Sequence, residues 1–533
     1  MERLPGTAHL PAGPERADAV DRPAGVPAQQ LRRLPVQPAH GGIGAHHPAP
    51  RGPVLRVPAD VHQGRPDREL QMTSAFSRRS FLRGATATAG AGALALLAAG
   101  CATGSRSSDP NQVSLWGVTG TFVPFQTKVI ERFKQLHPDV DVVVNQVPSQ
   151  GTGDATSIIT AVRGGTAPDL WLLDRFSAAQ YAAIGLIEPI DELIDEYEDQ
   201  SKEEFLSQWL GFAVGEVSYE GKTYGLPHDT DARGMFVNRT VLRDAGVDLD
   251  EFDWEQNGPV TMDRMWEVSQ QVTKKSAGDY TRMGLLPWYG EGWPFTWGLG
   301  LGASYYDQRD SRMTMNSASV RSVYDFYAEW AERLDYRAAD TFIATYEPTG
   351  HPPGQTAFMG NRMAFMVSVP STIQSFDNYG PKDLDWTTAF LPVQQEGDPK
   401  YTWSGGYALC LPKGSKKTKA VWDLMKYFTG TEGQKTYMVP ATSVPTNIAA
   451  LEAPDGSARS IRYFVESITS STCRPPLPVG GAWWDSLADA RSSVLLGTAT
   501  PEQAVERAQN RVDPMMQTYA PFALPKDYDK VRI

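Results

Sequence analysis

Apolar strand-like runs alternate with helix-like runs at the start of the globular part of this 533-residue chain. Val129, Phe133 and Leu136 have helical spacing, and ATSIITAVRGG (155–165) is a second helical run that a glycine pair closes. Because short connections join strand, helix, strand, helix and strand, the pattern predicts an α/β fold with a parallel sheet covered on both faces. Such a sheet binds ligands at the carboxyl ends of its strands. The three strand-like runs are VSLWGV (113–118), VDVVVNQVP (140–148) and APDLWLL (167–173).

Residues 1–71 differ in composition from the rest of the chain. They are rich in Pro, Arg, Ala and Gly and have no apolar periodicity, so they cannot bury enough surface to offset the entropy of ordering. Two interpretations remain open. The segment is either a disordered tail or an upstream extension of a protein whose translation begins at Met72.

The segment 72–101 has the zones of an export signal in their usual order. SRRSFL (77–82) resembles a twin-arginine motif, and an apolar run rich in Ala and Gly follows at 84–100. That run is too short and too rich in small residues to predict a membrane span. It ends on LAAGC, which resembles a lipobox with Cys101 as the lipidated residue; the alternative is a core helix. The pattern predicts export, a lipid anchor on the outer face of the cell membrane and a polar tether at 102–111.

The charge and the motif content of the remaining chain exclude several classes of protein. From Cys101 onward the chain carries 38 basic and 55 acidic side chains, a net charge of −17, which argues against a nucleic-acid partner. His137, His228 and His351 lie far apart without metal-ligand spacing. Motifs for nucleotide binding and for thiol or serine chemistry are missing. We therefore expect no metal, no cofactor and no enzymatic activity.

Two further cysteines follow the lipobox, Cys410 in the apolar run YALCLP and Cys473. In an oxidising compartment the two could form a disulfide, whereas a buried strand would hold Cys410 as a free thiol. The sequence leaves both alternatives open.

Five blocks of the sequence resemble, in their order, the extracellular solute-binding proteins of family 1. Members of this family are the carbohydrate-binding subunits of ABC importers, and maltose-binding protein is the best-known of them. The blocks are GGTAPDLWLLDRFSAAQYAAIGLIEPID (164–191), GKTYGLPHDTDARGMFVNRTVLRDAG (221–246), GQTAFMGNRMAFMVSVPS (354–371), WSGGYALCLPKGSKKTKAVWDLMKYFTGTEGQ (403–434) and GGAWWDSLADARSSVLLGTATPEQAV (480–505).

The resemblance implies a periplasmic-binding-protein-like fold, in which two α/β lobes close like a hinge over a ligand in the cleft between them. Lobe 1 would comprise 112–224 and 405–448, and lobe 2 would comprise 225–404 and 449–520, with 521–533 as a C-terminal tail. It further implies a monomer that binds a sugar or oligosaccharide without chemical change. The partners would be the permease subunits of an ABC transporter.

A sugar site needs aromatic rings against the C–H faces of the sugar and carboxylate or guanidinium groups against its hydroxyls. Asp174 and Arg175 follow the third strand, where the resemblance implies an Asp-Arg pair on sugar hydroxyls. In PHDTDARGMFVN, Asp231 stands where the resemblance implies a sugar-binding acid, and Asp229 and Arg233 flank it. We expect these five side chains at the ligand.

Aromatic and glycine-rich loops supply the other candidates. Gly405 and Gly406 would let the backbone approach a ligand closely or rotate at a hinge. Trp483 and Trp484 are neighbours on a predicted helix, where side chains diverge by about 100°, so we expect at most one of them to stack on sugar. The remaining candidates are Trp116, Thr119, Gly120, Trp288, Trp293, Trp297 and Trp403.

The sequence therefore predicts a lipid-anchored receptor that captures a saccharide for an importer. Two alternatives remain: an exported glycan-active enzyme, such as a glycosidase or lyase, and the same fold with a peptide, polyamine or iron chelate as its ligand.

Overall fold

A computed structural model describes residues 107–118, 123–145, 155–441, 443–451 and 459–531, all within one compact unit, Gly90–Ile533. The expected export signal, the lipidation site Cys101 and the segment 1–71 lie outside the described residues. Within the described ranges, no helix combines the length and the apolar character that a membrane span requires.

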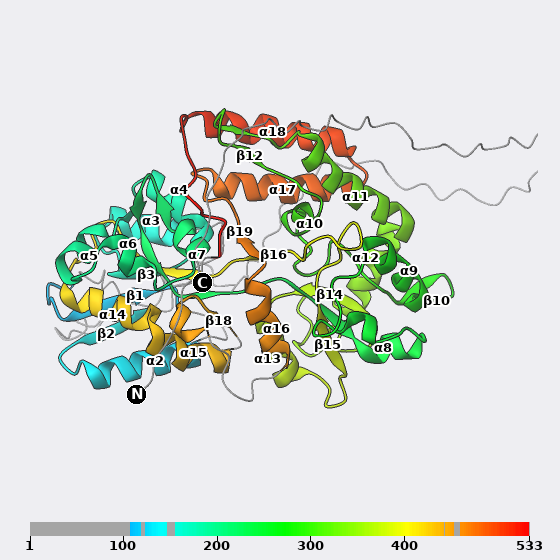
Figure 1. Ribbon diagram of the computed structural model, residues 1–533, viewed down its shortest axis with the longest axis horizontal. Coiled ribbons are helices and arrows are strands. Elements are labelled where there is room, and N and C mark those ends of the chain that lie inside the picture. Colours follow the sequence, from blue (N-terminus) through cyan, green and yellow to red (C-terminus); the bar gives the residue numbers. More distant parts are fainter. Residues whose placement is uncertain (1–106, 119–122, 146–154, 442, 452–458, 532–533) are drawn as a thin grey trace, which may run out of the picture. The chain divides into compact units, whose positions relative to one another are not determined.

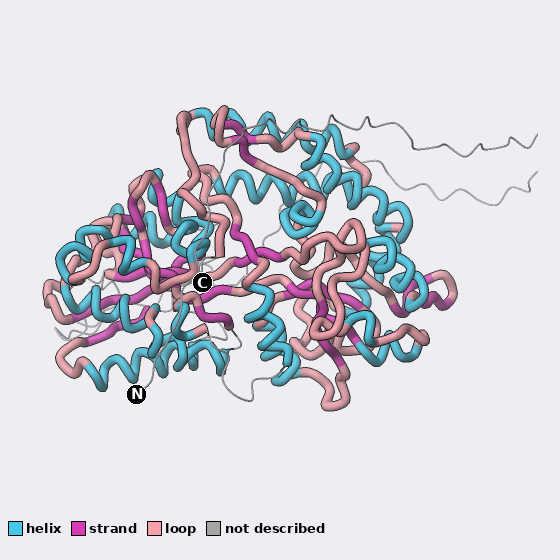
Figure 2. Tube along the Cα trace, in the orientation of Figure 1, coloured by secondary structure: helices cyan, strands magenta, loops and turns pink. Residues whose placement is uncertain are grey.

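Six strands form the first sheet: β1 (Gln112–Trp116), β2 (Asp141–Asn145), β3 (Leu170–Asp174), β4 (Ile187–Glu188), β7 (Gly225–Pro227) and β17 (Tyr407–Pro412). β1 pairs in parallel with β2 and with β3, so the parallel arrangement expected from the sequence is confirmed (Figures 1 and 2). The strand order is β2-β1-β3-β17-β4, and β7 also pairs with β17. β17 comes from much later in the chain and runs antiparallel to all of its partners.

Hydrophobic cores cover both faces of this sheet. Leu170 and Leu172 of β3 belong to one core and Trp171 and Leu173 to the other, as the alternation of side chains along a strand requires. The first core includes α2 (Val123–Leu136), α5 (Asp191–Tyr197), α6 (Lys202–Leu206) and α14 (Lys419–Thr429). The second includes α3 (Thr156–Arg163), α4 (Ala178–Ala183) and α7 (Gly211–Glu216).

Two details of the helices differ from expectation. Leu136 shares the helical spacing of Val129 and Phe133, yet it is the last residue of α2 and is 51% exposed, whereas the other two are buried. The run 420–438 predicts one helix, but the structure has α14 and then α15 (Thr431–Ala441). The break falls at Gly430, whose backbone is extended at ψ −179°, and a glycine lowers the cost of leaving the helix there.

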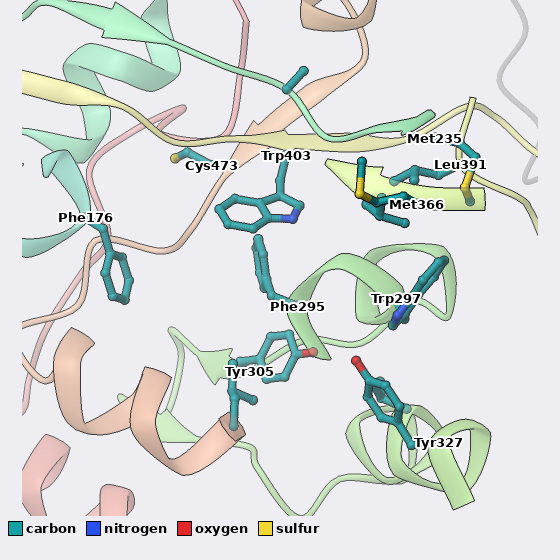
Figure 3. Close-up of a cluster of buried hydrophobic side chains, with 14 of the residues drawn as sticks. Phe176, Met235, Phe295, Trp297, Tyr305, Tyr327, Met366, Leu391, Trp403 and Cys473 are labelled. Carbon is teal, nitrogen blue, oxygen red and sulfur yellow. The ribbon is translucent and has the colours of Figure 1, made fainter. Parts of the chain in front are cut away.

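The second sheet is antiparallel and consists of β9 (Gly234–Asn238) between β14 (Phe365–Ser368) and β15 (Trp386–Ala389). All five residues of β9 are buried. Two helices pack against β15 of this sheet, α8 (Arg239–Asp244) and α16 (Arg459–Ile468). The other helices of this part of the chain are α9 (Met262–Val272), α10 (Pro294–Gly300), α11 (Ala318–Leu334), α12 (Tyr336–Tyr346), α13 (Ser371–Tyr379), α17 (Gly480–Leu495) and α18 (Pro501–Gln517). The two sheets with their helices are the two α/β lobes that the sequence predicts. Figure 3 shows part of the aromatic core around α10.

Short strands lie where the chain passes between the two sheets: β8 (Asp229–Thr230), β16 (Thr402–Ser404), β18 (Val444–Pro445) and β19 (Ser471–Cys473). β8 leads directly into β9, and β16 leads into β17 of the first sheet. β18 pairs with β8, and β16 pairs in parallel with β19. We call 229–233 and 402–407 the crossing segments.

The remaining short elements lie in connections. They are β5 (Ser218–Tyr219), β6 (Lys222–Thr223), β10 (Lys274–Ser276), β11 (Asp279–Arg282), β12 (Tyr306–Asp307), β13 (Arg312–Met313), and the 3-10 turns η3 (Arg175–Ser177), η4 (Asp250–Phe252) and η5 (Ile448–Ala450).

Cys410 and Cys473 are both buried free thiols, which decides between the two alternatives left open by the sequence. Cys410 lies in β17 and Cys473 in β19, where its Sγ donates to the carbonyl oxygen of Tyr528 at 3.1 Å. Burial raises the pKa of both thiols well above the ordinary value, so neither is poised to react as a thiolate.

Candidate functional site

A polar pocket of about 240 Å³ opens at the crossing segments, next to the end of β3. It contains six residues that the sequence marks as site candidates: Asp174, Asp229, Asp231, Arg233, Gly405 and Gly406. The other lining residues are Thr230, Val369, Pro370, Ser371, Tyr407, Ser443 and Arg474. Val369 and Pro370 connect β14 to α13, which begins at Ser371, so residues that follow strands of both sheets meet at this pocket.

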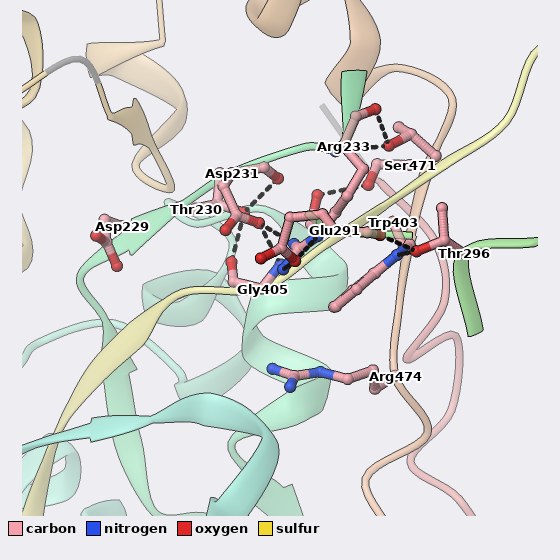
Figure 4. Close-up of polar contacts among 12 residues, drawn as sticks. Asp229, Thr230, Asp231, Arg233, Glu291, Thr296, Trp403, Gly405, Ser471 and Arg474 are labelled. Carbon is pink, nitrogen blue, oxygen red and sulfur yellow. Dashed lines mark hydrogen bonds and ion pairs between the residues drawn. The ribbon is translucent and has the colours of Figure 1, made fainter. Parts of the chain in front are cut away.

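Side chains hold the two crossing segments together. Asp229 Oδ1 accepts a hydrogen bond from the Tyr407 amide at 2.7 Å. Asp231 Oδ1 accepts one from the Gly405 amide at 2.6 Å (Figure 4). The Thr402 hydroxyl oxygen lies 2.9 Å from the amide nitrogen of Arg233, whose proton it accepts, and it donates to the same residue's carbonyl at 2.8 Å. The acids expected to bind ligand therefore also fix the geometry of the crossing.

Gly406 occupies a place that no other residue fits without strain. Its φ is +131°, and a Cβ there would lie 2.3 Å from the Asp229 carbonyl oxygen and 2.5 Å from Nη1 of Arg175. The close backbone approach expected at this glycine is thus an approach between protein segments.

Arg175 is completely buried, with 0% exposure, and its guanidinium donates hydrogen bonds to other protein groups. Its Nε donates to Glu216 at 3.0 Å, Nη2 donates to the Gly405 carbonyl at 2.6 Å, and Nη1 donates to the Asp229 carbonyl. We therefore remove Arg175 from the expected ligand contacts, because it braces both crossing segments from behind. The neighbouring Asp174 is half-buried and does line the pocket.

Arg474 is the pocket cation that the sequence reading missed. Its Nη2 donates to Asp174 Oδ1 at 2.9 Å, and its guanidinium lies 4.2 Å from the ring centre of Phe176. It follows β19 in CRPPLP, a run without a distinguishing pattern. Only the pairing of β19 with β16 brings it to the pocket.

Arg233 joins the pocket to the aromatic residues. It pairs with Asp231 at 2.5 Å and with Glu291 at 3.1 Å, and its guanidinium covers the ring of Trp403 at 3.3 Å (Figure 4). Trp403 is 1% exposed and donates from Nε1 to Thr296 Oγ1 at 2.9 Å. Because Trp403 is almost completely buried and Arg233 covers its ring, it supports Arg233 and does not offer a face to ligand. Glu291 was also missed, although it stands in the aromatic loop PWYGEGW.

The other expected tryptophans divide into buried and half-buried ones. Trp297 and Trp483 are 1% and 0% exposed and lie in the core, so we also remove them from the expected contacts. Trp293 and Trp484 are half-buried with ring centres 5.4 Å apart, and Trp484 lies 5.4 Å from the guanidinium of Arg474. These two rings form an aromatic wall next to the pocket. The divergence expected of adjacent tryptophans on a helix thus puts one of α17's pair inside and the other at the wall.

Two further candidates, Trp116 and Trp288, are described and lie away from the pocket lining. Trp116, at the end of β1, is half-buried, and Trp288 is half-buried with its ring 5.4 Å from that of Tyr336. Neither lines the pocket. Thr119 and Gly120 lie outside the described residues.

Burial sets the proton affinity of two acids at the crossing. It raises the pKa of Asp229 to about 7, with Asp231 and Asp174 adding to the rise and the Tyr407 amide and Arg175 opposing it. It raises the pKa of Glu216 to about 6 against the charges of Arg175 and Arg474. In the parts of the chain that the structure describes, no group of three or more His, Cys, Asp or Glu side chains is arranged to hold a metal.

Two lobes with a polar pocket at their crossing define a binding protein for a small solute. The family model for bacterial extracellular solute-binding proteins matches residues 128–461, and the chain belongs to that family. Among curated relatives, the maltotriose-binding protein of Pyrococcus abyssi is 22% identical over 381 residues, which are 68% of this chain and 73% of that protein. The arabinooligosaccharide-binding protein of Bacillus subtilis is 24% identical over 348 residues, 64% of this chain and 74% of that protein.

Solved structures agree on the fold. CpMnBP1 with mannobiose bound has a TM-score of 0.65 at 20% identity and covers 75% of this chain and 99% of its own. The GacH receptor of Streptomyces glaucescens, solved without ligand and with acarbose, has a TM-score of 0.60 at 20% identity and covers 76% of this chain and 98% of its own. At these identities the likeness establishes the two-lobed architecture.

Proposed function

We propose that this protein captures a sugar or short oligosaccharide outside the cell membrane and delivers it, chemically unchanged, to the permease subunits of an ABC importer. The observation that carries the proposal is the pocket, which three aspartates and Arg474 line; the guanidinium of Arg474 lies 5.4 Å from the ring of the half-buried Trp484, and Trp293 packs against Trp484. Carboxylates accept hydrogen bonds from neighbouring hydroxyls, and indole rings cover the C–H faces of a sugar. The sugars named for several relatives support the same ligand class.

We propose as ligand contacts the side chains that line the pocket or its aromatic wall. They are Asp174, Asp229, Asp231, Arg233, Trp293, Trp484 and Arg474. Gly405 and Gly406 would present their backbone to the ligand.

The lobe boundaries are part of the proposal. We assign 112–230 and 405–448 to lobe 1 and 234–404 and 449–520 to lobe 2. The sequence predicts the start of lobe 2 at 225, but β7 pairs with β17 of the first sheet, so we place the first crossing at 231–233. Ligand would draw the lobes together around these crossings, and the closed form would be the one that the permease recognises.

Attachment to the membrane through a lipid on Cys101 and export by the twin-arginine route belong to the same proposal. So do a monomeric state and the absence of catalysis. The order of the zones in 72–101 supports the lipid anchor and the export route.

Isothermal titration calorimetry of the purified full-length protein against mono- to tetrasaccharides tests the proposal. Saturable binding of one saccharide per protein supports it, and binding of a peptide, polyamine or iron chelate in place of saccharides contradicts it. After each titration the saccharide is assayed for new reducing ends. Their appearance would assign the pocket to a glycan-active enzyme.

A further inference from the structure

In each of the three pocket aspartates, one carboxylate oxygen accepts a hydrogen bond from another described residue and the other does not. Asp174 Oδ1 accepts from Arg474, Asp229 Oδ1 accepts from the Tyr407 amide, and Asp231 uses Oδ1 in the same manner. Among the described residues, none of the three Oδ2 atoms has a hydrogen bond. The protein therefore presents three carboxylate oxygens to whatever enters, and a ligand rich in hydrogen-bond donors matches them.

One of the three aspartates differs from the other two in having no ion-pair partner among the described residues. Asp231 pairs with Arg233 at 2.5 Å, and Asp174 pairs with Arg474 at 2.9 Å. Asp229 is 6% exposed, lines the pocket, and forms no ion pair among the residues that the structure describes. It is a nearly buried acid at the pocket, and one of its carboxylate oxygens has no hydrogen-bond partner among the described residues.

The surroundings of Asp229 do not supply the missing cation. Arg175, the nearest arginine, gives its charge to Glu216 at 3.0 Å and contacts only the backbone carbonyl of Asp229. Burial accordingly raises the pKa of the Asp229 carboxyl to about 7. The ionisable groups that act on Asp229 from its own and neighbouring elements are Asp174, Arg175, Asp231, Tyr407 and Tyr437.

A buried carboxylate without a counter-charge is costly, and the cost falls when a cation arrives with the ligand. A neutral hydroxyl can donate to Asp229 but cannot neutralise it. An ammonium group does both, and the resulting hydrogen bond is charge-assisted. An anionic sugar would face the oxygens of three carboxylates, while Arg233 and Arg474 are already paired.

We propose that the saccharide selected by this pocket carries a protonated amino group, which donates to Oδ2 of Asp229. The ligand class is thus an amino sugar, free or within a short oligosaccharide. This inference rests on the proposed function, because it takes the ligand to be a saccharide.

Matched probes that differ in one group test the inference by calorimetry on the full-length protein. They are glucose and glucosamine, galactose and galactosamine, mannose and mannosamine, and the β-1,4-linked disaccharides of glucose, glucosamine and N-acetylglucosamine. In the best-binding set, we expect the amine to bind at least about tenfold tighter than its hydroxyl or acetamide counterpart. Because a cation lowers the pKa of Asp229, binding at pH 7 should also release protons. Titrations in two buffers with different ionisation enthalpies detect that release.

Asp229→Asn removes the charge and retains an oxygen that accepts from the Tyr407 amide. The variant should lose the preference, so that the ratio of amine to hydroxyl affinity falls to about one. Asp340→Asn removes a charge from an exposed position of α12 and should retain the wild-type ratio. A melting curve checks that each variant folds. If Asp229→Asn does not fold, the matched probes and the proton release, both measured on the wild-type protein, still test whether the pocket prefers an amino sugar.

Each result has a defined meaning. Tighter binding of neutral or anionic saccharides than of amines would overturn the amino-sugar inference and leave the proposed function standing. An amine preference that survives in Asp229→Asn would overturn the role of Asp229. Binding of spermidine, included as an amine without a sugar, with no binding of any saccharide would overturn both.

Discussion

Replacing Arg175 by methionine should destabilise the protein, because this buried guanidinium ties the two crossing segments to Glu216. Methionine retains most of the aliphatic volume, so the main losses are the ion pair at 3.0 Å and the donors to two carbonyl groups. Removing one partner of a buried pair costs about 3–5 kcal/mol, and a carbonyl left without a donor costs about 1–3 kcal/mol more. The Gly405 carbonyl keeps a donor in the Thr230 hydroxyl at 3.1 Å, so its share of the loss is small. Since neighbouring contributions do not add fully, we expect a loss of about 5 kcal/mol.

The assay is thermal unfolding of the ligand-free protein, followed by circular dichroism. With an unfolding entropy of about 2 cal/mol/K per residue over about 400 ordered residues, a loss of about 5 kcal/mol lowers Tm by about 6 °C. Arg163→Met on the exposed side of α3 is the matched control and should shift Tm by about 1 °C or less.

A second variant separates the ion pair from the carbonyl contacts. Adding Glu216→Gln to Arg175→Met removes a buried carboxyl whose remaining ion pair, among the described residues, is the 3.9 Å contact with Arg474, and should restore about 1–3 kcal/mol. An unchanged Tm in Arg175→Met together with a large loss of sugar affinity would refute the reasoning. Such a result would return Arg175 to the ligand contacts that the sequence suggested.

Three further predictions follow from the same structure. Trp484→Ala should weaken saccharide binding, measured by calorimetry, with little change in Tm. Trp483→Ala should cost about 3–5 kcal/mol of stability, measured by thermal melting. Equal effects of the two substitutions in both assays would contradict the assignment of Trp484 to the aromatic wall and Trp483 to the core. Cys101→Ser should move the protein from the membrane fraction to the soluble fraction on ultracentrifugation, and a variant that stays with the membrane would exclude the lipobox. The raised pKa values of Asp229, about 7, and Glu216, about 6, favour the protonated acids in the folded state, so their contribution to stability should be present at pH 4 and be lost as the pH rises through 6 to 7. Urea unfolding of wild type and Asp229→Asn between pH 4 and 8 measures this loss, and an equal slope in both proteins would show that Asp229 is not its source.

Local patterns were sufficient to predict the first sheet because the alternation of apolar runs is a property of neighbouring residues. β1, β2 and β3 follow one another with single helices between them, and such connections favour parallel pairing of the three strands. The insertion of β17 beside β3 could not be predicted in the same way. The two strands lie more than 200 residues apart, and YALCLP carries no signal for its partner.

The acids of the site were easier to locate than its cations. Asp174 is the last residue of β3, Asp229 begins β8 and Asp231 follows β8, so all three lie at strand ends, where a sheet presents its ligand edge. Arg175 and Arg474 are the same residue type, yet one is buried behind the crossing and the other lines the pocket. That difference depends on the pairing of β16 with β19, a contact between segments about 70 residues apart.

The tryptophans show the limit of composition as a signal. The loop 288–297 is rich in aromatic residues, but Trp297 already lies within α10 and turns into the core, where its Nε1 donates to the Pro287 carbonyl at 2.7 Å. Trp293 caps the same helix and stays half-buried at the wall. Trp293 and Trp297 are four positions apart, yet one is half-buried and the other lies in the core. The sequence alone does not predict the residue at which this helix begins, so it could not assign the two rings.

Hydrogen–deuterium exchange with and without a saturating saccharide tests most directly where ligand binds. Slower exchange of backbone amides in 229–233, 369–371 and 405–407 is expected, because these three segments line the pocket between the lobes. Slower exchange confined to other surfaces, with these segments unchanged, would show that the pocket is not the binding site.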